Sequence, residues 1–494
     1  MYQLTAKDLN TDAYDVNPAI LAAENPNSAV LEALLAYYEA RKDDKSLSDS
    51  EQNMISSLSP SASISPFGYF RSPIKSAIMI QSVENLRLLL HAGADPNGIT
   101  QVEIADYSSR FIRGRPRLWN TDNTGYCRRA AGLAHAQENG ISSPVCHLTS
   151  AELDERSEEF PVFWSEPVIP GQLLHMGRAS LAIEDVAYSG DLQFVDMLRA
   201  AGAEESAWFQ PESDDSDLWT FGDDAPVSVL SISSPVHEAL LGGHPTMLRH
   251  LLRHCGYSPN YRPRAVPTTA LCPLSHLLVH CDLGSENIQA CLSELLKHPH
   301  LDPNLRTPVF RIHPLHFAAA RHDPALLARL ARFTGGLAAA GVTALGHNLL
   351  HIVCLPHQAN QIKNTPEVVE SMHTARTLDW TYNHRPKSIF RKPKRVREEY
   401  MASRRPHPMT VAQQQAQQDT IKLLLQETGN EKGLKIDVSE QDVDGNTALH
   451  YLAGTLNMAE NTIDLVRGMQ GGEKVWNGTE NWWGLTPTQL WESK

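Results

Sequence analysis

One pattern recurs along this chain: two short apolar helices joined by a turn and followed by a polar loop. It is clearest at residues 72–97, where apolar residues fall at helical spacing twice in succession. Ser72 can cap the first helix, Pro73 suits its first position, and Gly93 suits the left-handed end of the second. A hairpin this small cannot bury its apolar side alone, so copies must stack.

Similar copies follow one another from residue 17 to the end of the chain. In the C-terminal half, the first residues of successive copies lie about 35 to 40 residues apart. This spacing is longer than that of a regular array of helical hairpins. The pattern predicts an all-α solenoid of about eight to ten helix-turn-helix repeats. The further copies cover residues 17–35, 181–202, 234–260, 272–304, 313–319, 348–354, 407–429 and 442–454, with a half-copy at 484–492.

These segments resemble the ankyrin repeat, whose signature is a T-P-L-H-x-A-A helix start followed by V-x-L-L-x-x-G-A-D. The best matches are Ser234–His237, His313–Ala319, Asp444–His450 and Leu89–Asn97. Lys75 stands where the motif has histidine, and the fifth and seventh copies have poor second helices. The resemblance covers about half of the chain. It implies an ankyrin-type α-solenoid that holds a protein partner.

Long segments without periodicity interrupt the copies. Such loops are usually functional or disordered. The predicted organisation is residues 1–97, N-terminal repeats with a Ser-rich linker; 98–171, an insertion with basic and aromatic residues; 172–355, central repeats with an acidic insertion at 204–226; 356–406, a basic insertion; and 407–494, C-terminal repeats and a cap.

The acidic insertion is the most unusual of these segments in composition. Residues 204–224 contain eight carboxylates and no basic residue, together with Trp208 and Trp219. The two indoles could anchor a partner, since aromatic side chains dominate interface energies. The segment could instead pair with basic residues around Arg110–Arg117 or 391–397, or remain a solvated acidic loop.

The run from Arg391 to Arg397 is the sharpest basic signal. Lys394, Arg395 and Arg397 fit the K-R-x-R spacing that nuclear import receptors bind. The same cations could bind an acidic surface or phosphates, or form a solvated loop.

Histidines are abundant, 22 in all, but many fall within the repeat motif. The resemblance implies that His237, His316, His351 and His450 hydrogen-bond backbone between adjacent repeats. A second set, Cys272, His276, His280 and Cys281, places three side chains along one helical face. Tetrahedral zinc needs four converging ligands, so we interpret Cys272 as a substitute for the threonine of the motif and predict neither metal nor cofactor.

Composition sets the expected compartment. Seven scattered cysteines favour a reducing environment, and no apolar run approaches the roughly 20 residues that span a membrane. The first residues lack a secretory signal, and a formal charge of −14 argues against general nucleic-acid binding. We expect a cytoplasmic protein, with the nucleus as the alternative.

The predicted function is an intracellular interaction scaffold that binds a protein partner on its concave face and loop tips. No nucleophile elbow, phosphate loop or zinc-protease motif is present in the sequence, and no catalytic residue is predicted. Two alternatives remain open: an ankyrin-fold enzyme for a small apolar metabolite, in a pocket closed by the insertions, and a nuclear regulatory adaptor. The candidate partner-binding residues are Trp208, Trp219, His244, Arg249, Tyr257 and Tyr451.

Overall fold

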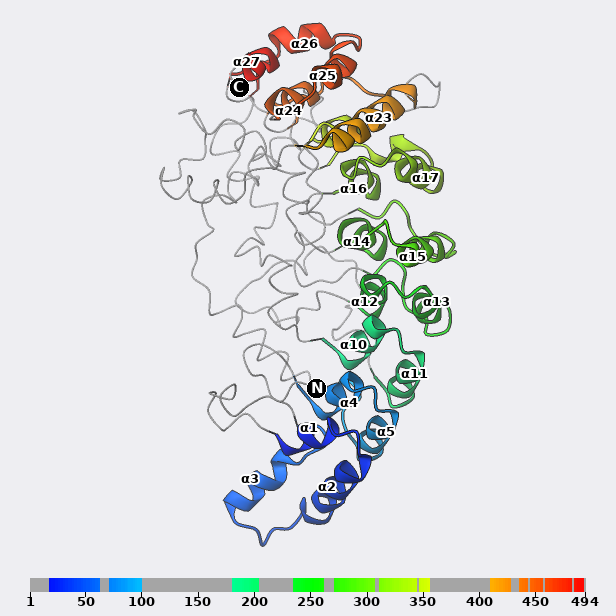
Figure 1. The fold of residues 1–494 in the computed structure, drawn as a ribbon, viewed down its shortest axis with the longest axis vertical. Coiled ribbons are helices and arrows are strands. Elements are labelled where there is room, and N and C mark those ends of the chain that lie inside the picture. Colours follow the sequence, from blue (N-terminus) through cyan, green and yellow to red (C-terminus); the bar gives the residue numbers. More distant parts are fainter. Residues whose placement is uncertain are drawn as a thin grey trace, which may run out of the picture.

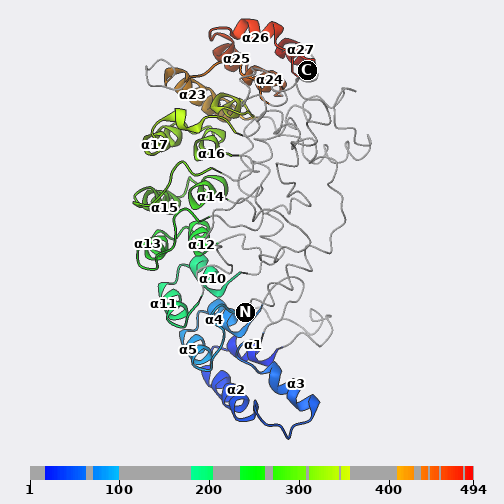
Figure 2. The same ribbon diagram turned by 180° about the vertical axis from the view of Figure 1, so that it is seen from behind.

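The fold is all-α, a curved stack of ankyrin-like helical hairpins in which neighbours in sequence are neighbours in space (Figures 1 and 2). The structure is a computed structural model. It describes residues 17–62, 71–99, 180–203, 234–261, 271–306, 311–343, 346–355, 409–427, 435–442, 445–455, 458–481 and 484–492.

The first helix of each pair lies on the inside of the curve and the second on the outside (Figure 1). We call these the inner and outer rows. In order, the pairs are α1 (Pro18–Ala23) and α2 (Ser28–Arg41), α4 (Pro73–Met79) and α5 (Val83–His91), α10 (Ala182–Ser189) and α11 (Leu192–Ala200), α12 (Pro235–Gly242) and α13 (Pro245–Arg253), α14 (Pro273–His280) and α15 (Glu286–Leu296), α16 (Pro314–Ala320) and α17 (Pro324–Thr334), α18 (Leu349–Val353) and α23 (Val411–Glu427), and α24 (Ala448–Gly454) and α25 (Glu460–Arg467).

Within the described ranges, four elements lie outside these pairs. Helix α3 (Asp49–Ser57) follows the first hairpin, and the 3₁₀ turn η4 (Leu337–Ala340) follows α17. Helices α26 (Gly472–Gly478) and α27 (Pro487–Glu492) close the C-terminal end, where the Trp476 and Trp491 rings lie 6.5 Å apart. Trp482 and Trp483 lie outside the described residues.

The ends of the hairpin helices follow the expected local chemistry. The Oγ of Ser72 accepts a hydrogen bond from the backbone N–H of Lys75, and Pro73 is the first helical residue. Gly93 has a φ of +82°, as predicted. Gly190 also has a positive φ, and a Cβ there would lie 2.6 Å from Nδ1 of His244 in the next hairpin. Any side chain at position 190 would clash with that imidazole, so this turn requires glycine.

One hydrophobic core runs along the stack between the two rows. Ile74, Leu86 and Leu89, which share the predicted buried side of the hairpin at 72–97, are at most 1% exposed. The core continues through the neighbouring pairs to Leu490 in α27. Burial of each apolar side is therefore completed by the adjacent hairpins.

Two details of the predicted repeats are wrong. The fifth copy was expected to have a poor second helix, yet α15 is a full helix of 11 residues with Ile288, Leu292 and Leu295 buried. The copies at 348–354 and 407–429 form a single hairpin, since α23 is one continuous helix that packs on α18. Its stretch of Gln and Ala residues favours helix and lacks the glycine that would make a turn. The basic insertion therefore lies inside a repeat.

Lys75, which replaces the histidine of the motif, joins the hairpins on either side of residues 100–179. Its Nζ donates a hydrogen bond to Oγ of Ser180 at 2.8 Å and lies 3.1 Å from Oδ2 of Asp185 in α10. The backbone N–H of Ala182 also donates to the carbonyl of Asn97 at 2.9 Å. The stack is thus continuous where the sequence is interrupted.

None of the helices in the described ranges is long and apolar enough to cross a membrane.

Replacing Lys75 with Met tests this join. Methionine retains the apolar stem and removes the ammonium, which leaves the partly buried Asp185 without its cation. We expect the free energy of unfolding to fall by about 1 to 2 kcal/mol, measured by urea denaturation. Arg87→Met is the matched control, because the pair of Arg87 with Glu84 is exposed and joins residues of one helix. An equal loss in both variants would contradict a special role for Lys75.

Candidate functional site

The residues predicted to bind a partner fall into three groups. His244 and Arg249 lie on the surface of the fourth hairpin: Nε2 of His244 is 3.0 Å from the carbonyl of Tyr188, and Arg249 forms a two-pronged ion pair with Glu294 in α15. Tyr257 is 5% exposed and Tyr451 is fully buried, so both belong to the framework. Trp208 and Trp219 lie outside the described residues, as do Lys394, Arg395 and Arg397.

Three of the four motif histidines, His237, His351 and His450, make the backbone contacts between repeats that the resemblance implied, whereas Nε2 of His316 is buried without a hydrogen-bond partner. Nε2 of His237 lies 2.9 Å from the carbonyl of Leu271, and Nε2 of His450 lies 3.0 Å from that of Leu485. The carbonyl of Leu271 lies just before α14, and that of Leu485 lies just before α27. These imidazoles are fully buried and act as polar links between hairpins.

The cysteine and histidine set on α14 is taken up by packing. Cys272 is the N-cap of α14, in the place of the threonine of the motif. The rings of His276 and His280 contact each other at 4.7 Å, while the thiol of Cys281 points to the carbonyl of Leu240. Among the described residues, no group of three or more His, Cys, Asp or Glu is arranged to hold a metal ion.

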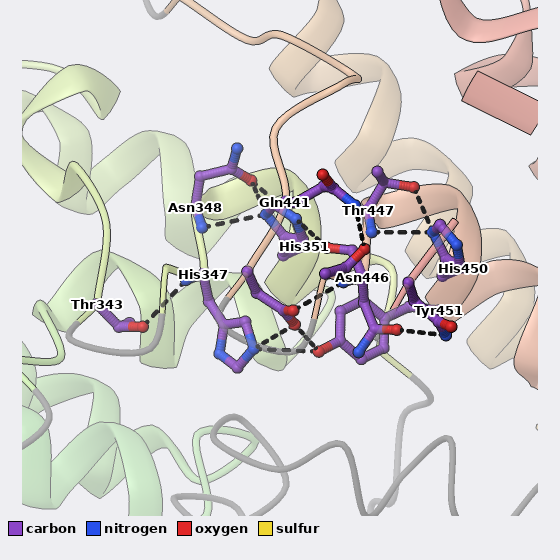
Figure 3. Close-up of polar contacts among 12 residues, drawn as sticks. Thr343, His347, Asn348, His351, Gln441, Asn446, Thr447, His450 and Tyr451 are labelled. Atoms are coloured by element: carbon purple, nitrogen blue, oxygen red, sulfur yellow. Dashed lines mark hydrogen bonds and ion pairs between the residues drawn. The ribbon is translucent and has the colours of Figure 1, made fainter. Parts of the chain in front are cut away.

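A buried polar cluster joins the last two hairpins (Figure 3). Nε2 of His347, in the loop before α18, lies 3.1 Å from Oδ2 of Asp442 and 3.1 Å from the hydroxyl of Tyr451 in α24. The same hydroxyl donates a hydrogen bond to Asp442. Three side chains from two hairpins therefore form a closed triangle, which we call the His–Asp–Tyr cluster.

The turn before α24 holds Asp442 in place. Its Oδ1 accepts the backbone N–H of Asn446 at 2.9 Å, and its own N–H donates to the carbonyl of Asn446. The side chain of Asn481, near the C-terminal end, donates to Asn446 in turn (3.0 Å). The ring of His351 lies 6.1 Å from that of His347. The cluster thereby links the hairpins on both sides of the turn to the end of the stack.

The charges in this region depend on burial and pairing. Burial alone would raise the pKa of Asp442, but its bonds to His347 and Tyr451 hold that pKa below its ordinary value. Burial lowers the pKa of His351 and of His450 to about 4, so both are neutral near pH 7. Asp442 is thus a buried carboxylate stabilised by hydrogen bonds.

A carboxylate, an imidazole and a phenol in mutual contact are groups that acid–base catalysis uses. Here the side chain of His347 is 3% exposed and that of Asp442 is 0% exposed. The hydrogen bonds within the triangle occupy the groups that a substrate would need. This geometry favours a structural link over catalysis.

The sequence offered no reason to single out His347, and it placed Tyr451 among the candidate partner-binding residues. The only available signal was the D-x-D-G-N-T turn, which predicts that Asp442 bonds its own turn but not that a second oxygen meets His347, 95 residues away.

Among the described residues, the exposed large apolar side chains of the inner row lie in its N-terminal half. Met79 of α4 and Tyr188 of α10 each lie seven residues after the N-cap of their helix, and they are 64% and 55% exposed. Leu21 of α1, one turn earlier in its own helix, is 51% exposed. These helices pack side by side, so we call Leu21, Met79 and Tyr188 the apolar row.

The buried histidines predict loss of stability in acid. Their folded-state pKa lies below the ordinary value near 6.5, so the stability they contribute is complete above about pH 6.5 and is lost as the pH falls towards 4. Over that window, protonation of His351 and of His450 would each lower the free energy of unfolding by on the order of 3 kcal/mol. Urea midpoints measured between about pH 7.5 and pH 4.5 should fall steadily. A flat profile would contradict neutral buried imidazoles.

Asp442→Asn tests the His–Asp–Tyr cluster. An amide accepts at one of its two positions only, so it must lose either the hydrogen bonds from His347 and Tyr451 or the one from the backbone N–H of Asn446. We expect a loss of about 3 kcal/mol in the free energy of unfolding and faster hydrogen exchange in α24. The control is Asp464→Asn, because Asp464 is 63% exposed and its ion pair with Arg467 is long, at 3.9 Å. If the two variants are equally stable, the cluster does not hold the hairpins together.

Protein-family models and curated proteins give no match to this chain. Solved structures do. One is a chain from the complex of a predatory endopeptidase of Bdellovibrio bacteriovorus with its immunity protein, at 12% identity and a TM-score of 0.32, covering 59% of this chain and 100% of that one. Another is the ankyrin repeat domain of Bcl-3, at 15% identity and a TM-score of 0.29, covering 62% and 92%. What this chain does is therefore inferred from its own surface.

Proposed function

We propose that this chain is a scaffold of divergent ankyrin repeats that binds a protein partner through the apolar row. The exposure of Met79 and Tyr188 at equivalent places in adjacent hairpins carries the proposal. Side chains of this size are usually covered in a folded protein, and contiguous exposed ones mark interaction surfaces. A methionine and a tyrosine also suit the centre of an interface, where both residue types are enriched.

Polar groups border the row and are already paired. Glu24 forms an ion pair with Arg71, and Asp185 forms one with Lys75. His244 bonds the carbonyl of Tyr188 and so fixes the turn beside the row. A partner would then bury apolar side chains without leaving an unpaired charge underneath, which lowers the cost of binding.

The C-terminal half of the inner row offers a partner fewer exposed apolar side chains. Large apolar side chains of α16, α18 and α24, namely Phe317, Ile352 and Tyr451, are at most 1% exposed. The N-terminal half therefore supports the proposal better than the region of residues 442–467 does. Nuclear entry through Lys394, Arg395 and Arg397 remains a prediction, as do partner contacts by Trp208 and Trp219.

The double variant Met79→Asp/Tyr188→Asp tests the proposal. Tagged full-length chains would be purified from cells with their bound proteins, which are then quantified by mass spectrometry. We expect the specific partners to fall about tenfold or more, since two carboxylates would be buried in the interface.

The matched control is Phe333→Asp/Val411→Asp, which alters two exposed apolar residues on the outer row (45% and 84% exposed). It should retain the partners of the unmodified chain. Thermal unfolding shows whether each variant is folded. Equal recovery of partners by both folded variants would overturn the proposal.

A further inference from the structure

A second surface lies on the outer row, where α13 and α15 end side by side (Figures 1 and 2). It is rich in cations and histidines. Arg249 and Arg253 are about half exposed, at 49% and 51%, and His254, Lys297 and His300 are exposed as well. We call this surface the basic–histidine patch; its residues are Arg249, Arg253, His254, Lys297, His298 and His300.

Several contacts join the two helix ends. The guanidinium of Arg253 lies 3.7 Å from Glu294 of α15, and the rings of His298 and His300 are 5.8 Å apart. Asn260, in the loop after α13, donates a hydrogen bond to the carbonyl of His300 at 2.7 Å. The patch is therefore one surface built from two repeats.

Among the described residues, the ion pairs of the patch run to one carboxylate, that of Glu294. Glu294 is 13% exposed, and Arg249 already engages both of its oxygens, at 2.9 and 3.0 Å. Arg253 shares that carboxylate at a longer distance, and no carboxylate of the described residues lies within ion-pair distance of Lys297.

The adjoining elements carry two further carboxylates. Asp196 of α11 is 2.8 Å from Nε2 of His250, and Asp302 accepts the backbone N–H of Asn304. Arg199 of α11 lies over the ring of Tyr257, and Arg329 of α17 bonds Gln289 and Ser293 of α15. Basic residues at helix C-termini offset the helix dipole, which explains one cation per helix. It does not explain six basic residues over two adjacent ends.

Like charges affect each other within the patch. Burial, and then the neighbouring His300 and Arg253, lower the pKa of His298. Protonating this imidazole therefore adds a positive charge among others. A bound anion would relieve that repulsion, so anion binding and protonation should reinforce each other.

We propose that the basic–histidine patch binds an acidic segment of a partner protein, and that it does so more tightly in acid than at neutral pH. Packed helices lie about 10 Å apart, and alternate residues of an extended chain lie about 7 Å apart. A peptide with several carboxylates can therefore contact both helix ends at once, with more charges than a single small anion offers. The patch is separate from the apolar row, so this proposal does not depend on the proposed function.

The test measures binding of a fluorescent glutamate-rich peptide to the full chain by anisotropy. We expect binding at low salt that weakens as salt rises, and that tightens about tenfold between pH 7.5 and pH 5.5. Arg253→Glu/Lys297→Glu should abolish binding. His254→Gln/His298→Gln/His300→Gln should retain binding at pH 7.5 and lose the gain in acid.

The control Arg87→Glu/Lys422→Glu makes the same change of charge on outer helices away from the patch, and it should bind like the unmodified chain. Circular dichroism confirms folding of each variant. Equal weakening by the control would show attraction by net charge alone and overturn the proposal. Absence of peptide binding by the full chain at low salt would also overturn the proposal. This includes the result in which the chain binds the peptide only after residues 204–224 are deleted, because the acidic segment of the chain itself would then occupy the patch.

Discussion

Every hairpin in this stack depends on its neighbours, because two short helices cannot cover their own apolar sides. The constraint also applies to polar groups. Carbonyls between hairpins lose contact with water when the repeats stack, and each needs a donor to replace it. The neutral imidazoles of His237 and His450 meet that need. Lys75, in the place of the histidine, joins its junction through the side chains of Ser180 and Asp185 instead, and the His–Asp–Tyr cluster adds a buried carboxylate. The side chains that make the polar contacts therefore differ from junction to junction.

This requirement explains how the chain tolerates long insertions. A hairpin is stabilised by contact with the adjacent hairpins and not by the length of chain between them, and lengthening a loop costs little in entropy. The hydrogen bond from Ala182 to Asn97 and the bonds of Lys75 reconnect the stack around residues 100–179. Gln417 of α23 does so around residues 356–408, with its amide bonded to the carbonyls of Val353 and Leu355. Insertions can therefore diverge without loss of the framework.

Local features of the fold could be predicted from the sequence because they depend on residues close together in the chain. The helix start at Ser72 and Pro73, and the positive φ of Gly93, are confirmed. The approach of His347 to Asp442 depends on which hairpins are adjacent after stacking, and one sequence carries no signal for a contact across 95 residues. The pairing of α18 with α23 was missed for the same reason, since the intervening insertion hid that the two helices form one repeat.

The distribution of polar groups also decides where a partner can bind. In the C-terminal half the large apolar side chains of the inner row are buried and the groups of the His–Asp–Tyr cluster bond each other, so few apolar side chains are available to a partner there. In the N-terminal half the ion pairs of Glu24 and Asp185 are complete, and Met79 and Tyr188 remain exposed. The basic–histidine patch lies on the opposite, outer row, so a ligand there does not compete for the same surface. An apolar surface and a charged surface on opposite rows of one stack could hold two different proteins at once, and the affinity of only the charged one would follow pH.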